Sequence, residues 1–153
     1  MGCLEVYIHI NFMCTNLKKC IAKTFEKVFI EWFYLNDTPV SIVRLYIKGD
    51  LYFDITCCEE NVSIREQEEI PENKVFQEFA YKPIEQNIEW LHQCKIDSIK
   101  YLMDLHNIKR GILFIFHNNH NFVYYNKGYE FDDNDIFEID ANIKLLPYVL
   151  IDI

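Results

Sequence analysis

The chain has 153 residues, of which 50% are hydrophobic and 16% are aromatic. This length fits one domain with a real core, and the aromatic content excludes an intrinsically disordered chain. The formal net charge of -9 argues against nucleic acid or an anionic membrane as the main ligand, because both bind basic surfaces. We therefore expect a single domain over residues 1–153, and a basic protein is the partner that the charge favours.

The hydrophobic segments and the N-terminus predict a cytoplasmic protein. No apolar run approaches the roughly 20 residues needed to cross a bilayer, and the start lacks the basic region, apolar core and cleavage site of a secretory signal. Gly2 could begin a myristoylation pattern, but Val6 stands where that pattern needs Ser or Thr. The 6 cysteines are scattered without CxxC spacing, which favours reduced thiols over a disulfide framework.

The first third of the chain predicts a strand, then a long helix. Residues 4–12 alternate apolar and polar side chains, the pattern of a strand with one buried face. Thr15 or Asn16 can then cap a helix that ends at the turn formed by residues 36–39. Its apolar positions repeat every three or four residues, which places Trp32 in the core; they are Leu17, Ile21, Phe25, Val28, Trp32 and Leu35.

The middle of the chain predicts a β-hairpin followed by acidic sequence. Residues 40–47 and 51–57 are rich in β-branched and aromatic side chains, and the turn around Gly49 separates them. A third strand at residues 62–66 would precede a solvated acidic loop that extends to residue 73.

A second long helix is predicted from the first turn at Pro83 to Asn107, with a break near residues 95–97. Trp90 falls about 60° from its apolar line, at the boundary or surface. Residues 112–116 are wholly apolar, as in a central strand covered on both faces. An Asn-rich turn at residues 117–121 then leads to a strand at residues 122–125. Residues 145–153 predict a final strand or tail, which Pro147 places at a sheet edge.

This order of elements lacks regular βαβ alternation and predicts an α+β fold rather than a doubly wound α/β fold. We expect a mixed, mostly antiparallel sheet of about five to six strands, with two long amphipathic helices packed on it.

Histidine and cysteine pairs give weak signals for chemistry. His117 and His120 could share a metal if the backbone were helical there, but a third ligand is missing, so a polar hairpin tip is the preferred interpretation. Cys94 and His92 would diverge around the axis of the predicted helix. No Gly-rich phosphate loop, nucleophile elbow or HExxH motif is present. We therefore predict no cofactor and no metal.

Acidic residues are concentrated in two segments, residues 59–72 and 130–140. The second has the composition of a calcium loop, but Phe137 stands where an EF-hand starting at Asp132 needs Gly. A solvated acidic segment that meets a basic partner is therefore preferred to a metal site.

These acidic segments carry a resemblance of overall character. A small, acidic, cysteine-containing domain with aromatic-rich strands and no active-site motif resembles the immunity proteins of bacterial toxin–immunity pairs, especially those of contact-dependent growth inhibition systems. The resemblance implies an antitoxin that binds a cognate toxin domain, often a basic nuclease, and blocks its active site or substrate surface.

The predicted partner-binding residues are the carboxylates of the two segments together with two tyrosines, which are common interface anchors. They are Glu66, Glu68, Glu69, Glu72, Glu130, Asp132, Asp133, Asp135, Tyr124 and Tyr125. The carboxylates would attract a positive cleft while the aromatic rings supply a desolvated centre.

Two other functions stay open at this point. An enzyme using converging carboxylates and His92, His106 or His117 would show a deep, mostly apolar pocket, whereas an inhibitor would show a flat or convex acidic face. An acidic inhibitor that mimics nucleic acid would space its carboxylates regularly along an elongated body. The sequence indicates neither the partner's identity nor the oligomeric state.

Overall fold

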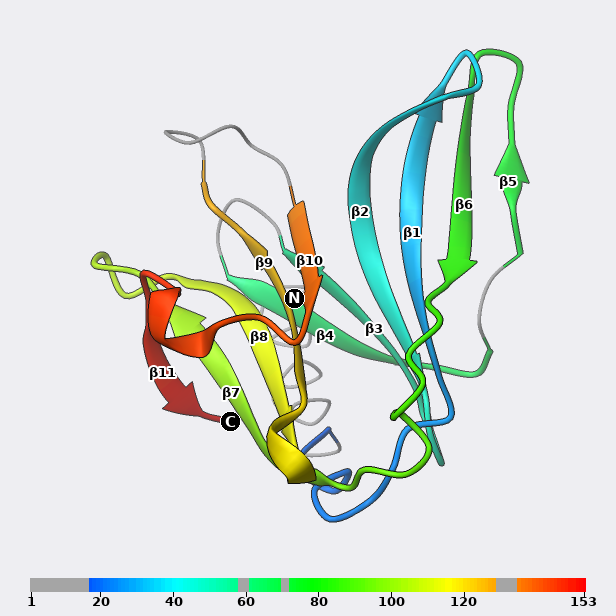
Figure 1. Ribbon diagram of the computed structural model, residues 1–153. Helices are drawn as coiled ribbons and strands as arrows, with labels where there is room; N and C mark the ends of the chain where they lie inside the picture. Colours follow the sequence, from blue (N-terminus) through cyan, green and yellow to red (C-terminus); the bar gives the residue numbers. More distant parts are fainter. Residues whose placement is uncertain (1–16, 58–60, 70–71, 129–134) are drawn as a thin grey trace, which may run out of the picture.

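Two antiparallel β-sheets make up the computed structural model, which describes residues 17–57, 61–69, 72–128 and 135–153 (Figure 1). Sheet A has the order β4-β3-β2-β1-β6-β5. Its strands are β1 (Lys27–Leu35), β2 (Thr38–Lys48), β3 (Tyr52–Cys57), β4 (Val62–Gln67), β5 (Lys74–Val75) and β6 (Phe79–Glu85). Sheet B has the order β10-β9-β8-β7-β11. Its strands are β7 (Ile96–Met103), β8 (Lys109–Phe116), β9 (Asn121–Asn126), β10 (Asp135–Ile139) and β11 (Val149–Asp152).

The predicted α+β class with two long helices is wrong, because both helical segments contain strands instead. The first predicted helix is replaced by turns and then β1. In β1 most side chains are β-branched or aromatic, which favours a strand. Val28 and Trp32 also share a strand face with Ile30, so these two residues fit both a helical stripe and a strand face. Pairing with β2 and β6 decides in favour of the strand.

The second predicted helix is divided between β6 and β7, with turns between them. Its helical spacing has a specific cause in β7. The register with β8 shifts between Ile96 and Ser98, so Ile96 and Ile99 are both buried although they are three residues apart. A β-bulge of this kind adds a residue to one strand and produces a spacing that resembles one helical turn.

Several predicted elements are confirmed. β2 and β3 form the predicted hairpin, and β4 covers the predicted third strand. The wholly apolar run lies in β8, the central strand of sheet B, and β11 is an edge strand. The turn before β9 holds Asn118 and Asn119 at φ values of 65° and 64°, the left-handed backbone that its asparagines indicated. The predicted strand at residues 4–12 lies outside the described residues.

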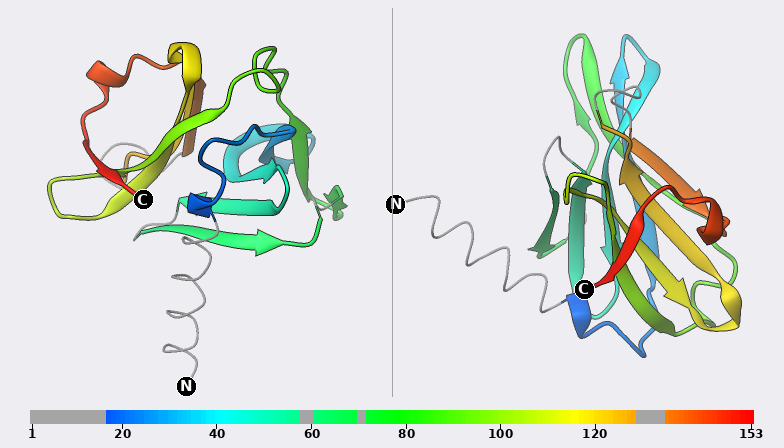
Figure 2. Two further views of the ribbon diagram at one scale, coloured as in Figure 1. Left: turned by 90° about the horizontal axis from the view of Figure 1, so that it is seen from below. Right: turned by 90° about the vertical axis from the view of Figure 1, so that its left-hand side faces the viewer.

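The main core lies between the two sheets. β2 faces β10, β4 faces β8 and β3 faces β9, and Figure 2 shows the two layers from two further directions. Phe25, just before β1, makes ring contacts with Phe114 at 5.5 Å and Phe116 at 6.1 Å. Trp32 and Trp90 are both partly buried against this core, which agrees with the predicted boundary position of Trp90, whereas Trp32 is less buried than its predicted core position.

A second, smaller cluster covers the other face of sheet B. It is formed by Leu102, Leu113, Val123 and Tyr125, and the segment that includes Ile143 and Tyr148 packs on it. Sheet B is thus covered on both faces, whereas sheet A has one face that belongs to neither cluster. Among the described residues, no helix has the length and apolar character to span a membrane.

Candidate binding groove

The strand register assigns the side chains of sheet A to two faces. Leu45 of β2 pairs with Ile55 of β3, which pairs with Ile64 of β4, and all three belong to the main core. Their neighbours in the chain point the other way, because successive side chains of a strand alternate. We call this second side the outer face of sheet A. It carries Glu31 of β1, Arg44 and Tyr46 of β2, Asp54 of β3, and Arg65 and Gln67 of β4.

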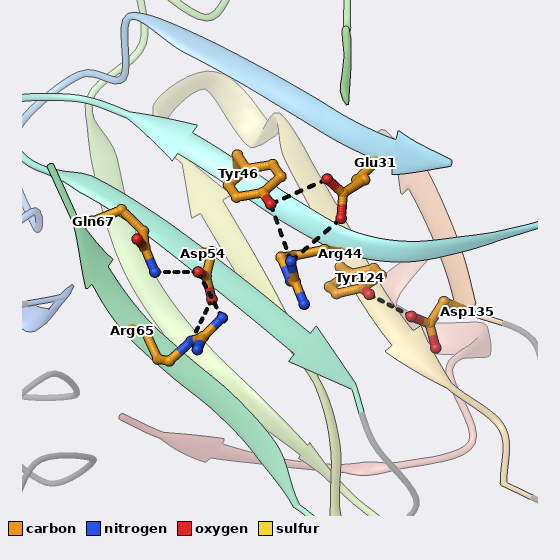
Figure 3. Close-up of polar contacts among 8 residues, drawn as sticks. All are labelled: Glu31, Arg44, Tyr46, Asp54, Arg65, Gln67, Tyr124 and Asp135. Atoms are coloured by element: carbon orange, nitrogen blue, oxygen red, sulfur yellow. Dashed lines mark hydrogen bonds and ion pairs between the residues drawn. The ribbon is translucent and has the colours of Figure 1, made fainter. Parts of the chain in front are cut away.

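A buried carboxylate on the outer face holds the first of two arginines (Figure 3). The side chain of Glu31 is 2% exposed. Arg44 Nη1 donates to Glu31 Oε1 at 3.3 Å and to Tyr46 Oη at 3.1 Å, while Tyr46 Oη donates to Glu31 Oε2 at 3.2 Å. Burial disfavours the charge on Arg44, but these partners outweigh burial and raise its pKa. Arg44 therefore stays positively charged at this position.

A second buried carboxylate lies one strand further across the sheet. Asp54 is 2% exposed. Arg65 donates to it twice, from Nε to Oδ1 and from Nη2 to Oδ2, each at 3.1 Å. Gln67 Nε2 also donates to Asp54 Oδ2. A two-point Arg–carboxylate contact fixes orientation as well as charge, so the side chains of this face are held in defined positions.

Within the described parts of the chain, Arg44 Nε is the one buried side-chain nitrogen or oxygen that has no hydrogen-bond partner. A buried donor left without an acceptor costs about 1–3 kcal/mol.

The outer face is hollowed into an open pocket of about 610 Å³, which we call the groove. It is lined by Arg44, Tyr46, Asp54, Arg65, Glu66, Gln67, Glu68, Glu69 and Lys74. Arg65 is on β4 and Lys74 is on β5, strands at opposite edges of sheet A. Because both edge strands contribute to one pocket, the sheet curls around its outer face.

The structure brings three of the predicted partner-binding residues together, since Glu66, Glu68 and Glu69 line the groove. Glu72 is exposed on the connection from β4 to β5. Asp135 is on sheet B, where it accepts a hydrogen bond from Tyr124 (Figure 3). It also accepts one from Asn126 Nδ2 at 2.8 Å. The predicted residues Glu130, Asp132 and Asp133 lie outside the described residues.

Tyr124 and Tyr125 are not on the surface. Their exposures are 0% and 5%, because sheet B is covered on both faces and consecutive residues of β9 enter the two clusters. Burial raises the pKa of Tyr124 well above its usual value. We therefore leave both tyrosines out of the candidate surface and assign them to the core.

Sequence analysis missed the groove floor, Glu31, Arg44, Asp54 and Arg65. Glu31 falls within the first predicted helix, outside its apolar positions, and the other three fall within predicted strands. One signal was present: Asp54 sits in the middle of β3, and charged residues are almost never fully buried unless they are paired. Its partner is 11 positions away, on the adjacent strand, and only the register identifies it.

The histidine pair forms a polar turn, as preferred from the sequence. His117 Nε2 lies 3.8 Å from Asp97 Oδ1, and His120 Nδ1 lies 3.1 Å from Asp140 Oδ1. The His120 ring also stacks on Trp90, with ring centroids 4.6 Å apart. Among the residues that the structure describes, no group of three or more His, Cys, Asp or Glu is arranged to hold a metal ion.

Cys94 and His92 also separate, but in a turn rather than in the predicted helix. Cys94 is buried and lies 3.9 Å from Asn118 Nδ2, whereas His92 is exposed. No catalytic pair is formed by these two side chains.

Comparisons of the chain with protein-family models, with curated proteins and with solved structures found no match.

Proposed function

We propose that this chain binds a basic protein partner in the groove of sheet A and neutralises it. In the setting that its overall character resembles, the partner is a toxin domain, such as a basic nuclease, whose active site or substrate surface becomes blocked. The observation that carries the proposal is the position of Glu66, Glu68 and Glu69, which come from one acidic segment and line one hollow.

The charges of the groove favour a positive ligand. Arg44 and Arg65 are each paired with a buried carboxylate, Glu31 and Asp54. With these two groups neutralised, Glu68 and Glu69 outnumber Lys74, the remaining cation of the lining. Such a surface raises the association rate of a basic partner and orients it, an effect that salt screens.

The shape of the groove refines the mode of binding. An inhibitor was expected to have a flat or convex acidic face, but the outer face is hollow. An enzyme was expected to have a mostly apolar pocket, but the lining of this hollow is charged. A hollow acidic surface fits a protruding basic segment of the partner. The ion pairs hold the floor in place before binding, which lowers the ordering cost of association.

The test is a charge reversal in the groove. The double variant Glu68→Lys and Glu69→Lys should bind the protein encoded by the gene directly upstream at least about tenfold more weakly, with a smaller salt dependence. Isothermal titration at low and at physiological salt measures both. The matched control is Glu89→Lys with Asp97→Lys, which reverses two exposed carboxylates outside the groove and outside both acidic segments and should bind like the original chain.

Two results would contradict the proposal. One is the absence of any binding between the chain and that upstream product. The other is an affinity and a salt dependence that the groove variant shares with the original chain. Thermal unfolding of each variant checks that the fold is retained.

A further inference from the structure

Four aromatic rings form a cluster beside the groove: Phe33 of β1, Phe79 and Tyr81 of β6, and Phe76 just before β6. The ring centroids are 5.4 Å apart for Phe33 and Tyr81, 6.2 Å for Phe33 and Phe79, and 4.6 Å for the stacked pair Phe76 and Phe79. We call these four residues the aromatic cluster. Mutual packing holds the rings in defined orientations.

The aromatic cluster is exposed to an unusual degree for side chains of this kind. Phe76 is 52% exposed and Phe79 is 38% exposed, and Leu35, which pairs with Phe79 across the ladder, is 46% exposed. Contiguous apolar surface of this kind on a folded domain marks an interaction site more often than isolated exposed residues do. The rings are therefore a candidate contact surface for a partner.

Register places the aromatic cluster on the same side of sheet A as the groove. Phe33 follows Glu31 by two residues in β1, and it pairs with Tyr81. Tyr81 pairs in turn with Lys74, which lines the groove. The strands β1, β6 and β5 stand side by side in Figure 1. The charged groove and the aromatic cluster thus form one continuous surface.

Charged residues of both signs border the aromatic cluster, and Lys74 is the one that pairs with Tyr81. Phe76 and Phe79 also line a smaller pocket of about 190 Å³, together with Asp37 and Glu78. Lys82 lines it too, with its Nζ 4.7 Å from the centroid of the Tyr34 ring. Glu68 and Glu69 of the adjoining groove, together with the exposed rings, favour a ligand that combines apolar contact with positive charge. A second copy of this chain fits poorly, because its own net charge of -9 would oppose the approach.

We infer that the aromatic cluster is the desolvated centre of the partner interface. It binds an apolar side chain of the partner's protruding segment, and basic residues of that segment flank this side chain. This inference rests on the proposed function. In it, the aromatic cluster takes the place of the buried Tyr124 and Tyr125 as the source of aromatic contacts. Basic residues next to that side chain lie over the groove, while rings and apolar side chain exclude water between them.

Two seven-residue peptides probe the surface of the full-length chain. One alternates lysine and leucine and the other alternates lysine and serine, so that they share charge and differ in apolar content. Chemical-shift titration of the isotope-labelled chain gives each affinity and locates the contact. The lysine–leucine peptide should bind about tenfold more tightly, with its largest shifts at the aromatic cluster.

In the variant Phe76→Ala with Phe79→Ala, the affinity for the lysine–leucine peptide should fall to that for the lysine–serine peptide. The matched control is Leu105→Ala with Val149→Ala, which truncates two apolar residues that are 96% and 62% exposed elsewhere, and it should retain the difference. All the truncated side chains are partly or largely exposed, so the fold should persist, and thermal unfolding verifies this.

The outcomes separate this inference from the proposed function. Equal affinities of the two peptides for the original chain, or an affinity difference that survives the aromatic double variant, would overturn the inference alone. Failure of both peptides to bind would overturn the inference together with the acidic groove on which it rests.

Discussion

The guanidinium of Arg65 meets the carboxylate of Asp54 through two parallel hydrogen bonds of 3.1 Å, on the face of sheet A that turns away from the core. The side chain of Asp54 is 2% exposed and that of Arg65 is 47% exposed, so a half-solvated cation neutralises a buried anion. This pair connects stability to function, because it stabilises β3 and β4 while it forms the floor of the groove.

Removing the cation of this pair should destabilise the fold. Arg65→Ala leaves Asp54 buried with Gln67 as its remaining side-chain hydrogen-bond donor, so we expect a loss of about 2 kcal/mol in the free energy of unfolding. Chemical denaturation measures the loss. Lys100→Ala breaks the exposed pair with Asp152 and should cost less than about 1 kcal/mol. Equal losses in the two variants would show that burial of Asp54 has no energetic weight.

The hydroxyl of Tyr46 should contribute to the stability of the groove floor. Tyr46→Phe removes the hydroxyl that donates to Glu31 and accepts from Arg44, and we expect it to cost about 1–2 kcal/mol in unfolding free energy. Tyr34→Phe is the matched control, because it retains the ring below Lys82 Nζ. The same denaturation experiment compares them, and a Tyr46→Phe variant as stable as the control would argue against a polar network.

Gly111 should not tolerate a side chain. A Cβ atom at this position would lie 2.3 Å from the backbone oxygen of Tyr124 and 2.3 Å from Tyr125 Cβ, so Gly111→Ala forces β8 and β9 apart. We expect a loss of about 3 kcal/mol in the free energy of unfolding. At Gly49 the nearest atom is Phe25 Cδ1 at 3.3 Å, where a ring can shift, and Gly49→Ala should cost clearly less.

The Gly111 measurement also checks the strand register. A midpoint of thermal unfolding for Gly111→Ala at or above that of Gly49→Ala would be incompatible with the close approach of β8 and β9.

The stability of the fold should fall in alkaline solution, and Cys20 should contribute to this fall. Burial raises the pKa of the Cys20 thiol from 9.0 to about 11, with a smaller opposing effect from Lys23. The unfolded chain therefore loses this proton first. The contribution is fully present below pH 9 and is lost as the pH rises toward 11.

Urea denaturation across this pH range, in the presence of a reductant, measures the effect. Cys20→Ala should show a shallower decline than the original chain. Burial also raises the pKa of Tyr46 and Tyr124, so a residual alkaline loss should remain in the variant. A decline of the same slope with and without Cys20 would exclude the thiol as a contributor.

Local sequence was sufficient to predict the elements that depend on neighbouring residues. Gly49 marks the β2–β3 turn, and Asn118 and Asn119 adopt the left-handed backbone that their short polar side chains tolerate. The continuous apolar run at residues 112–116, rich in β-branched and aromatic side chains, identified the central strand of sheet B, because a strand covered on both faces needs no polar positions.

The two predicted helices are wrong because the pairing between strands, and not local sequence, determines these segments. A bulge in β7 changes the spacing of its buried residues, and the register between β1 and β2 shifts twice, with the extra residues in β2. Val28 and Trp32 match a helical stripe as well as a strand face. Periodicity alone could not choose between the two, and pairing with β2 and β6 did.

By itself, the sequence determined that this chain is acidic, aromatic-rich and organised around several turns, since composition and turn chemistry are local properties. Only the tertiary structure decided where the acid lies. Glu66, Glu68 and Glu69 line a groove because β4 and β5, at opposite edges of sheet A, curl toward one pocket. The pairing of Asp54 with Arg65 likewise depends on strand register, which brings together residues that are distant in the chain.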